Sequence, residues 1–438
     1  MIWLCFFWFS LLYGCTFFAS PSKDVFSPLR FISIKFAVFN LPFIFFTALY
    51  PDSFLKGILT VCHTDVYSAF YNYTLLQTLA YVSLVGGILL FKPKTGVTEN
   101  NAASFNPHGV LWITVCLFAV AMAGYVFFLA RIGGLGYLLS HLKERVSLQG
   151  GQYSLILLEL FPLVLLLVLL LSRHYGRVAK KYFFLLLCLF FLVYTSFGSR
   201  KPAMIVAFAS LGGWHYYVEK IRVNRNTVLA GVIASVLLVS YIIAIPILRG
   251  GNQKLTAADK NPCYTVSKNF LYNFSYVFID VFAANYFNYS NAWHMEGYFA
   301  PAGAFMHKGD KGGIPQVDQG VYFKSIYLQQ KDFRPPMPRN SVCKTSWPTE
   351  NFGFAYANFL WIGVVVFFFL QGVVFSGAYN LFQKQYFNPV MLLFYLQVLV
   401  QFNFSSLRIA FFLKTLPLYC LCWFVFNKFA LHKNQKEI

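Results

Sequence analysis

The sequence predicts an all-α, polytopic membrane protein. Of its 438 residues, 58% are hydrophobic and only 11% are charged, whereas an ordinary soluble domain has roughly 25% charged residues. Apolar runs of about 16 to 25 residues recur along the chain, and each is long enough to cross a hydrocarbon layer as a helix. The alternating ten-residue segments that are typical of membrane barrels are missing. We therefore expect a bundle of about eleven transmembrane helices.

The expected spans share an apolar interior and polar or turn-forming ends. In chain order they are Met1–Ala19, Phe31–Tyr50, Ala69–Phe91, Gly109–Ala130, Tyr153–Leu171, Tyr182–Phe197, Pro202–Val218, Thr227–Leu248, Phe354–Tyr379, Pro389–Leu407 and Ile409–Phe426. The first run lacks the basic start of a cleaved signal peptide and is followed by further spans, so we expect it to be retained.

One long polar interval divides the chain into three expected parts. Residues 1–248 form an N-terminal bundle of about eight helices, residues 249–353 a large external loop, and residues 354–438 the C-terminal helices with a short tail. Within the loop, Phe270–Tyr289 is apolar but interrupted by Asn273, Asp280 and Asn285. This pattern indicates helices that rest on or re-enter the membrane.

The basic residues of the short connections predict the orientation, because Lys and Arg resist translocation. One alternating set is rich in them: Lys23, Arg30, Lys92, Lys94, Arg173, Arg177, Lys180, Lys181, Lys220, Arg222, Arg225, Lys384, Lys428, Lys433 and Lys436. The opposite short connections carry fewer: Lys56, Arg131, Lys143, Arg145, Arg200 and Lys201. We therefore expect the N-terminus outside, the C-terminus in the cytoplasm and the long loop on the outer face.

The net charge and the cysteines exclude several other classes of protein. A net charge of +20 would suit a nucleic-acid binder, but no basic run alternates with stacking aromatic residues on a polar domain. The nine cysteines show no metal-ligand spacing. Cys263 and Cys343 lie in the long loop and could form a disulfide if that loop faces an oxidising compartment.

Five basic residues lie beside outer helix ends, where positive charge opposes insertion: Arg131, Arg145, Arg200, Lys201 and Arg249. One interpretation is that each long side chain reaches the membrane interface without a specific role. Five such residues together favour the alternative, a site that binds an anion.

The sharpest of these positions is the segment from Phe197 to Pro202. Gly198 permits a tight turn, Ser199 can cap the next helix, and Pro202 suits its first turn. The helix start would then present free amides and two cationic side chains, an arrangement that suits phosphate or pyrophosphate. A helix hairpin with a merely basic turn is the alternative.

Other polar positions are also candidates. Leu135, Leu138, Leu139 and Leu142 recur at helical spacing and predict an interfacial amphipathic helix. Glu159 lies inside an apolar run, where an ionisable group is costly and is a functional candidate by default.

The long loop is rich in aromatic and amide side chains. Tyr289, Trp293 and Tyr298 could bind glycan, because flat aromatic faces suit the two surfaces of a sugar ring; alternatively, such rings pack a small cap. A general base for a sugar hydroxyl could be one of His294, Glu296, His307 or Asp318. No nucleotide-binding glycine loop, zinc-binding helix or nucleophile elbow appears.

Several landmarks together resemble the bacterial oligosaccharide repeat-unit polymerases, the O-antigen (Wzy-type) polymerase family. They are Arg131-Ile132-Gly133-Gly134 leading to Arg145, Gly198-Ser199-Arg200, Arg249-Gly250, Pro338-Arg339, and Tyr356-Ala357-Asn358-Phe359-Leu360-Trp361-Ile362-Gly363 followed by Gly372. The resemblance extends from Arg131 to Gly372. The chain departs from it at Lys344-Thr345-Ser346-Trp347-Pro348, where relatives commonly have a lysine-proline ending.

The resemblance implies a transferase of the bacterial inner membrane with the helical GT-C architecture. It would move glycan between undecaprenyl-pyrophosphate-linked oligosaccharides on the outer face, without a metal, nucleotide sugar or other cofactor. Membrane lipid, a chain-length regulator and a flippase are the expected partners, and nucleic acid is not.

The expected site residues follow from this combination. Arg131, Arg145, Arg200, Arg249 and Arg339 would hold pyrophosphate with help from Lys201, and His294 or Glu296 would activate the acceptor hydroxyl. An O-antigen ligase-like transferase and a secondary transporter or flippase of an anionic lipid-linked substrate are the alternatives; we find no repeat between the two halves that a transporter would favour.

Overall fold

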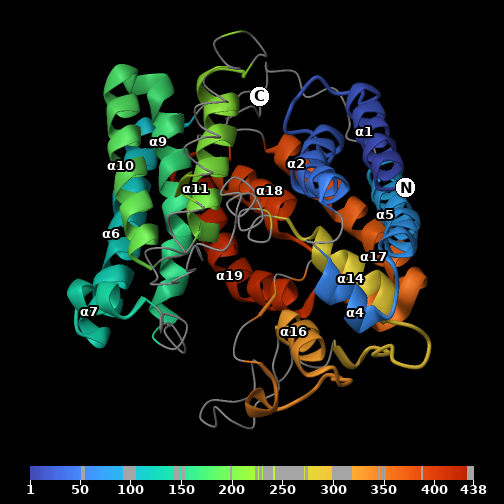
Figure 1. The fold of residues 1–438 in the computed structure, drawn as a ribbon. Helices are drawn as coiled ribbons and strands as arrows, with labels where there is room; N and C mark the ends of the chain where they lie inside the picture. The colour runs from blue at the N-terminus through green and yellow to red at the C-terminus, as the bar shows by residue number, and fades with distance from the viewer. Residues whose placement is uncertain are drawn as a thin grey trace. The chain divides into compact units, whose positions relative to one another are not determined.

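In the part that the computed structural model describes, the regular secondary structure is all helical, apart from an isolated bridge between Phe105 and Leu431. The described residues are 1–50, 55–91, 105–142, 148, 153–197, 200–221, 225, 229, 240–241, 271, 275–297, 318–343, 346–347, 349, 351–385 and 388–431. Figure 1 shows the helices that they form.

Seven helices of the described part are long and apolar enough to cross a membrane. They are α2 (Pro28–Leu49), α5 (Val66–Leu90), α6 (Pro107–Ile132), the continuous segment Ser154–Tyr175, α10 (Arg177–Ser196), α17 (Asn351–Lys384) and α19 (Ser406–Phe429). The expectation of an all-α, multi-pass membrane protein is confirmed.

Four expected spans differ from these seven helices. Three are present as shorter helices: α1 (Ile2–Phe18), α11 (Arg200–Gly213, continued by the π-helix Trp214–Val218) and α18 (Pro389–Gln401). The fourth, Thr227–Leu248, lies almost entirely outside the described residues. α1 and α18 end before the expected spans do, whereas α11 with its π-helical continuation reaches the expected end at Val218 and is interrupted only in its helix type.

Polar caps determine where two of the spans begin. The carboxylate of Asp65 accepts hydrogen bonds from the backbone N–H groups of Tyr67 at 2.8 Å and Ser68 at 3.1 Å, at the start of α5. The side chain of Asn106 accepts from the N–H of His108 at 3.1 Å, at the start of α6. These oxygens accept hydrogen bonds from the first N–H groups of each helix, which have no carbonyl partner within the helix.

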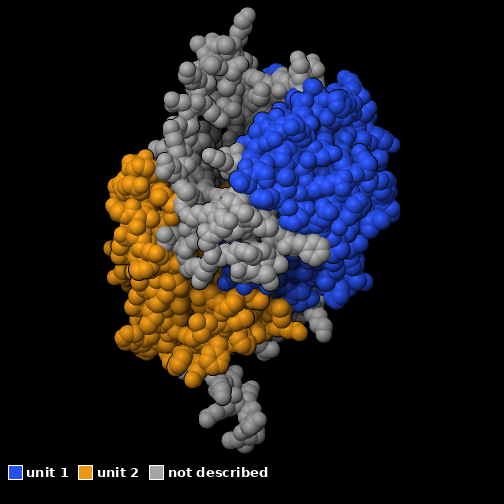
Figure 2. Space-filling view, turned by 90° about the horizontal axis from the view of Figure 1, so that it is seen from below, with its two compact units in different colours: residues 1–95, 267–380, 401–414 blue, residues 96–266, 381–400, 415–438 orange. Residues whose placement is uncertain are grey.

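The chain forms two compact units, which Figure 2 colours separately. Unit 1 contains residues 1–95, 267–380 and 401–414, and unit 2 contains residues 96–266, 381–400 and 415–438. These units cut across the three sequential parts expected from the sequence. The described part of the long loop packs with helices from both ends of the chain instead of forming a body of its own.

Unit 1 combines α1, α2 and α5 with α14 (Val277–Tyr286), a helix of the long loop. Residues Val277 to Ala284 of α14 are all buried, and the helix contacts α2, α5 and α4 (Lys56–Cys62) (Figure 1). At ten residues, α14 is too short to span a bilayer. The described part of this interrupted apolar region therefore contains a short buried helix.

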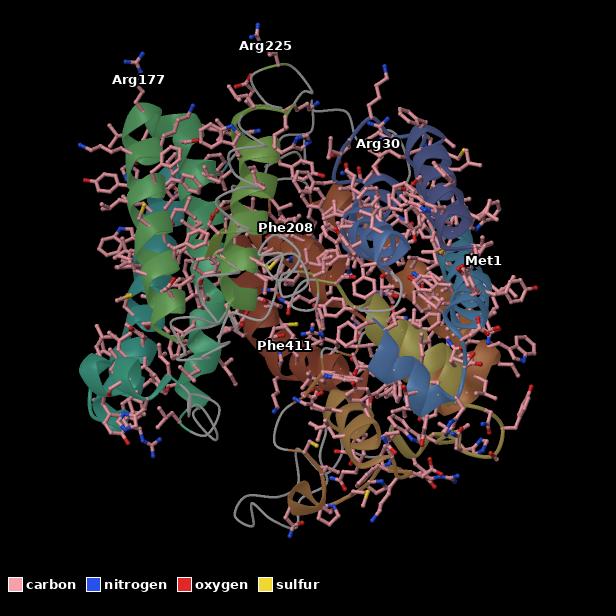
Figure 3. The ribbon with its side chains drawn as sticks, in the orientation of Figure 1. Met1, Arg30, Arg177, Phe208, Arg225 and Phe411 are labelled. Atoms are coloured by element: carbon pink, nitrogen blue, oxygen red, sulfur yellow. The ribbon has the colours of Figure 1, made fainter. Side chains whose placement is uncertain are left out.

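Unit 2 is built around α9 (Phe161–Tyr175), whose residues from Phe161 to Ser172 are all buried. Helices α6, α10 and α11 pack against it. Figure 3 shows Arg177, at the beginning of α10, with its side chain directed away from these helices. Helix α9 thus forms the core of unit 2. The charged start of α10 lies at one end of this unit.

Candidate functional site

Helix α17 is broken at Leu360, where the backbone has φ 54° and ψ −142°. The Nδ2 of Asn351 donates a hydrogen bond of 2.9 Å to Oε1 of Gln371, although these residues would lie about 30 Å apart on one straight helix. A Cβ atom on Gly363 would lie 2.4 Å from the carbonyl oxygen of Ala355. The helix therefore folds back on itself as a hairpin, the α17 hairpin, with a first arm of residues 351–359 and a second arm of residues 361–384.

The last carbonyl groups of the first arm hold a tight turn, Trp293 to Gly297, which we name the His294 turn. The N–H of Trp293 donates to the carbonyl oxygen of Ala357 at 2.7 Å, and the N–H of His294 donates to that of Asn358 at 3.1 Å. A helix leaves its last four carbonyl groups without internal partners. The break at Leu360 thus creates the acceptors that the turn uses.

The His294 turn exposes two of the residues predicted to be catalytic. His294 and Glu296 are both exposed, with Met295 between them. His294 and Met295 have φ values of 45° and 72°, a left-handed conformation that costs free energy for residues other than glycine. An imidazole and a carboxylate are therefore presented together on one constrained turn.

Trp293 anchors this turn in the interior of unit 1. Its side chain is 1% exposed, and its ring lies 5.3 Å from that of Phe287, 5.8 Å from Tyr322 and 5.4 Å from Phe323. Neither face of the indole is open in this conformation, so its predicted contact with glycan stays a prediction. Tyr289, by contrast, is 76% exposed.

Two buried amide side chains lie beneath the turn. The Nε2 of Gln319 donates to the carbonyl oxygen of Gly297 at 2.7 Å, and the Nδ2 of Asn358 donates to that of Phe354 at 2.8 Å. A Cβ atom at Gly297 would lie 2.9 Å from Oδ1 of Asn358 and 3.1 Å from Nε2 of Gln319. Position 297 is therefore in direct contact with both amides.

Two charged residues, Asp332 and Arg334, form a rim beside the exposed Tyr289. The Nη2 of Arg334 donates to the carbonyl oxygen of Ser290 at 2.7 Å, and the hydroxyl of Tyr286 donates to the carboxylate of Asp332. Burial and the neighbouring Asp332 raise the pKa of Tyr286, and Arg334 opposes that shift. This rim adds an exposed guanidinium to unit 1.

Asp318 is the predicted base candidate that precedes the buried Gln319. Burial raises the pKa of its carboxyl group, while hydrogen bonds from Ser346 and from the N–H of Gly320, at 3.1 Å, oppose the shift. The group is only partly exposed. Asp318 is thus less readily ionised than an ordinary aspartate.

In unit 2, the helix ends that carry Arg131 and Arg200 lie together. Near the end of α6, the hydroxyl of Tyr125 is 2.8 Å from that of Ser196 at the end of α10, and the next helix, α11, begins at Arg200 and Lys201. The exposed Arg131 lies in the last turn of α6, with its guanidinium 5.6 Å from the ring of Phe127.

The opposite end of unit 2 carries a different set of basic residues. The Nε of Arg173, at the end of α9, donates to the carbonyl oxygen of Tyr217 at 3.0 Å. Arg177 follows at the start of α10, at the same end (Figure 3). Arg131 and Arg200 are therefore at the other end from Arg173 and Arg177, which is the alternation expected from the basic residues of the connections.

Several predicted site residues are not among the described residues, and for others only the backbone is described. Arg145, Arg249, Tyr298, His307 and Cys263 are outside the described residues. For Arg200, Lys201 and Arg339 the structure describes the backbone, and Arg339 begins a short 3-10 helix. Cys343 is a free thiol, and because Cys263 is not among the described residues, the disulfide that the sequence allows stays a prediction.

The structure adds residues that sequence reasoning did not select for the site: Asn358, Gln319 and Arg334. Asn358 stood within the segment that carries the family resemblance, and an amide inside an apolar run was a usable signal. Gln319 had no such signal, because its proximity to the turn depends on the folding of the loop.

A second polar chain crosses the interior of unit 2. The hydroxyl of Tyr419 donates to Oε1 of Gln397, and the Nε2 of Gln397 lies 3.4 Å from the carboxylate of Glu159. Glu159 belongs to a 3-10 segment, Tyr153–Leu160, that leads directly into α9. The acid that the sequence marked inside an apolar run thus has a polar neighbour on α18.

Comparison with protein-family models, curated proteins and solved structures found no match. Among the described residues, no group of three His, Cys, Asp or Glu side chains could hold a metal ion. The interpretation of the site therefore depends on its own geometry and on the sequence landmarks.

Proposed function

We propose that this protein polymerises lipid-linked oligosaccharide repeat units, as a GT-C-type glycosyltransferase of the bacterial inner membrane. The observation that carries the proposal is the His294 turn. In a chain with only 11% charged residues, it presents an imidazole and a carboxylate together, on a backbone held by the α17 hairpin.

The chemistry follows from these groups. His294 or Glu296 accepts the proton of the acceptor sugar hydroxyl as its oxygen attacks the anomeric carbon of the donor glycan. A new glycosidic bond forms, the bond from that carbon to the pyrophosphate oxygen breaks, and undecaprenyl pyrophosphate leaves. Negative charge develops on the leaving group, so cations that hold it contribute to catalysis.

The proposed pyrophosphate ligands are Arg131, Arg145, Arg200, Arg249 and Arg339, assisted by Lys201. The adjacent helix ends at Arg131 and Arg200 support this part of the proposal, because they place two basic positions at one end of unit 2. Tyr289, Trp293 and Tyr298 are the proposed glycan contacts, with Tyr289 the exposed member in the described part.

The direct test uses cells in which the only copy of the protein is a variant. His294→Ala, Glu296→Ala and Arg200→Ala are compared with Met295→Ala and Arg177→Ala, which change an adjacent turn residue and a cation at the opposite end of unit 2. Loss of polymer in Arg200→Ala and in one base variant is expected, with single repeat units retained. Normal chain-length ladders in both base variants would reject the base, and normal ladders in Arg200→Ala would reject the pyrophosphate site.

The Glu159–Gln397–Tyr419 chain favours a second candidate, a secondary transporter or flippase. Acids inside membrane helices often mark ion or proton pathways, and transporters bind coupling ions at discontinuous helices. The same cells separate the two functions. Single lipid-linked units that accumulate on the outer face support polymerisation, whereas accumulation on the inner face supports a flippase.

A ligase-like transferase would use the same leaving group with a different acceptor. Its loss would leave complete polymer on undecaprenyl pyrophosphate, whereas loss of a polymerase leaves single units there. Analysis of the lipid-linked glycan by size therefore distinguishes the two transferases.

A further inference from the structure

Two buried side-chain oxygens beneath the His294 turn have no hydrogen-bond donor among the described residues, Oδ1 of Asn358 and Oε1 of Gln319. The two side chains are 0% and 3% exposed. Their orientation follows from the amide nitrogens, which donate to the carbonyl oxygens of Phe354 and Gly297. Exchanging oxygen and nitrogen would set two acceptors against each other, so the unpaired atoms are oxygens.

An unpaired buried acceptor is costly, and native proteins rarely keep one without a reason. Asn351, on the first arm of the same hairpin, shows the ordinary arrangement. Its Nδ2 donates to Gln371 at 2.9 Å, and its Oδ1 accepts from the N–H of Phe404 at 3.1 Å. The unpaired oxygen of Asn358 is therefore not a general property of asparagine in this hairpin.

The surroundings of the two oxygens indicate which kind of ligand would bind to them. Asn358 is at the C-terminal end of the first arm, where the helix dipole is negative and favours hydrogen-bond donors over anions. Both groups are neutral amides, which suit a neutral donor such as a hydroxyl. His294 and Glu296 lie on the turn directly above, because Gly297 contacts both amides.

We propose that Asn358 and Gln319 form a hydrogen-bond acceptor site for a sugar hydroxyl and position the acceptor glycan beside the His294 turn. This assignment depends on the proposed function and names its positioning residues. Gly297 is part of the site, because a methyl group there would lie 2.9 Å from the unpaired oxygen of Asn358 and would compete with a bound hydroxyl for the space beside it.

The test compares Asn358→Leu with Asn351→Leu in the full-length protein, purified in detergent. Lipid-linked saccharides extracted from cells that lack this protein are the probe. Asn358→Leu should leave the unfolding temperature nearly unchanged, because the loss of the hydrogen bond to the carbonyl oxygen of Phe354 is offset by the removal of an unpaired buried acceptor. It should bind the probe about fivefold to tenfold more weakly, as expected for a lost hydrogen bond. Asn351→Leu should unfold at a lower temperature and bind normally.

Failure of the inference is distinct from failure of the proposed function. A wild-type protein that does not bind the probe would overturn both. Normal wild-type binding with equal affinity in Asn358→Leu would overturn only the acceptor site.

If Asn358→Leu does not fold, Gly297→Ala tests the acceptor site in its place. The added methyl meets flexible side-chain ends, so folding is expected to persist while binding weakens. Gly377→Ala is the control, because a Cβ atom there has no neighbour within 4 Å. Unchanged binding in a folded Gly297→Ala protein would also overturn the acceptor site.

Discussion

The backbone N–H of His294 donates a 3.1 Å hydrogen bond to the carbonyl oxygen of Asn358, 64 positions later in the chain. In an unbroken helix that oxygen would accept from the amide four residues further on. The break at Leu360 ends the first arm and frees the oxygen for the turn. The position of the proposed base thus depends on an irregularity in a membrane helix.

The strain in the His294 turn predicts opposite effects of two substitutions at Met295. Its φ is 72° and its side chain is 49% exposed, so backbone conformation matters more than lost burial. Met295→Gly should leave the unfolding temperature unchanged or slightly higher, because glycine adopts this conformation without strain. Met295→Val should lower the free energy of unfolding by about 1–2 kcal/mol. Equal thermal stability of the two variants in detergent would contradict the strained turn.

Adjacent glycines on α5 provide a matched test of helix packing in unit 1. A Cβ atom on Gly87 would lie 2.1 Å from the carbonyl oxygen of Phe369, and one on Gly372 would lie 2.2 Å from that of Leu84. The backbones of α5 and α17 therefore touch. Gly87→Ala should lower the free energy of unfolding by about 2–3 kcal/mol.

Gly86→Ala is the control for this contact, because a Cβ atom there has no neighbour within 4 Å. It should be neutral or stabilising by up to about 1 kcal/mol, since alanine favours helix. Thermal unfolding of the two purified variants measures the difference. A stable Gly87→Ala protein would show that the two helices do not approach this closely.

Two aspartates should affect stability with opposite dependence on pH. Burial raises the pKa of Asp318 above its ordinary value of 3.8, so the folded state binds the proton more strongly than the unfolded state. Its contribution to stability is therefore most favourable at low pH and falls as the pH rises through the folded-state pKa. Asp318→Asn should remove this fall and raise the unfolding temperature at neutral pH.

Asp65 is the opposite case. Hydrogen bonds from the side chain and backbone of Ser68, and from the N–H of Tyr67, lower the pKa of its carboxyl group. The stabilisation is present above the unfolded-state pKa and is lost as the pH falls through the folded-state value. Asp65→Ala should therefore lower the unfolding temperature at neutral pH, with a smaller effect near pH 3. Parallel pH profiles for the two aspartate variants would contradict these assignments.

The polar chain of unit 2 predicts a coupling between Gln397 and Tyr419. Gln397→Leu removes the amide near Glu159 and also the acceptor of the Tyr419 hydroxyl. We expect a loss of about 1–2 kcal/mol for Gln397→Leu and a smaller loss for Tyr419→Phe. Because both changes break the same hydrogen bond, the double variant should lose less than the sum of the two. Strict additivity in thermal unfolding would show that the chain does not act as a unit.

Much of the architecture follows from the sequence alone. Helical class, multi-pass character and most helix positions follow from apolar runs, because a chain in hydrocarbon must satisfy its backbone groups internally. Capping residues such as Asp65 and Asn106 are readable for the same local reason. The polar composition of the long loop likewise shows from the sequence alone that His294 and Glu296 lie outside the membrane-spanning helices.

Only the tertiary structure decided how these parts form a site. Hydropathy reads Phe354–Tyr379 as one span, and the fold-back at Leu360 became visible only through contacts between Asn351 and Gln371. Trp293 looks in sequence like a sugar-stacking residue, but the rings of Phe287 and Phe323 cover it. The unpaired oxygens of Asn358 and Gln319 likewise depend on partners far apart in the chain. Local sequence determines which groups are available, whereas long-range packing determines which of them remain unpaired.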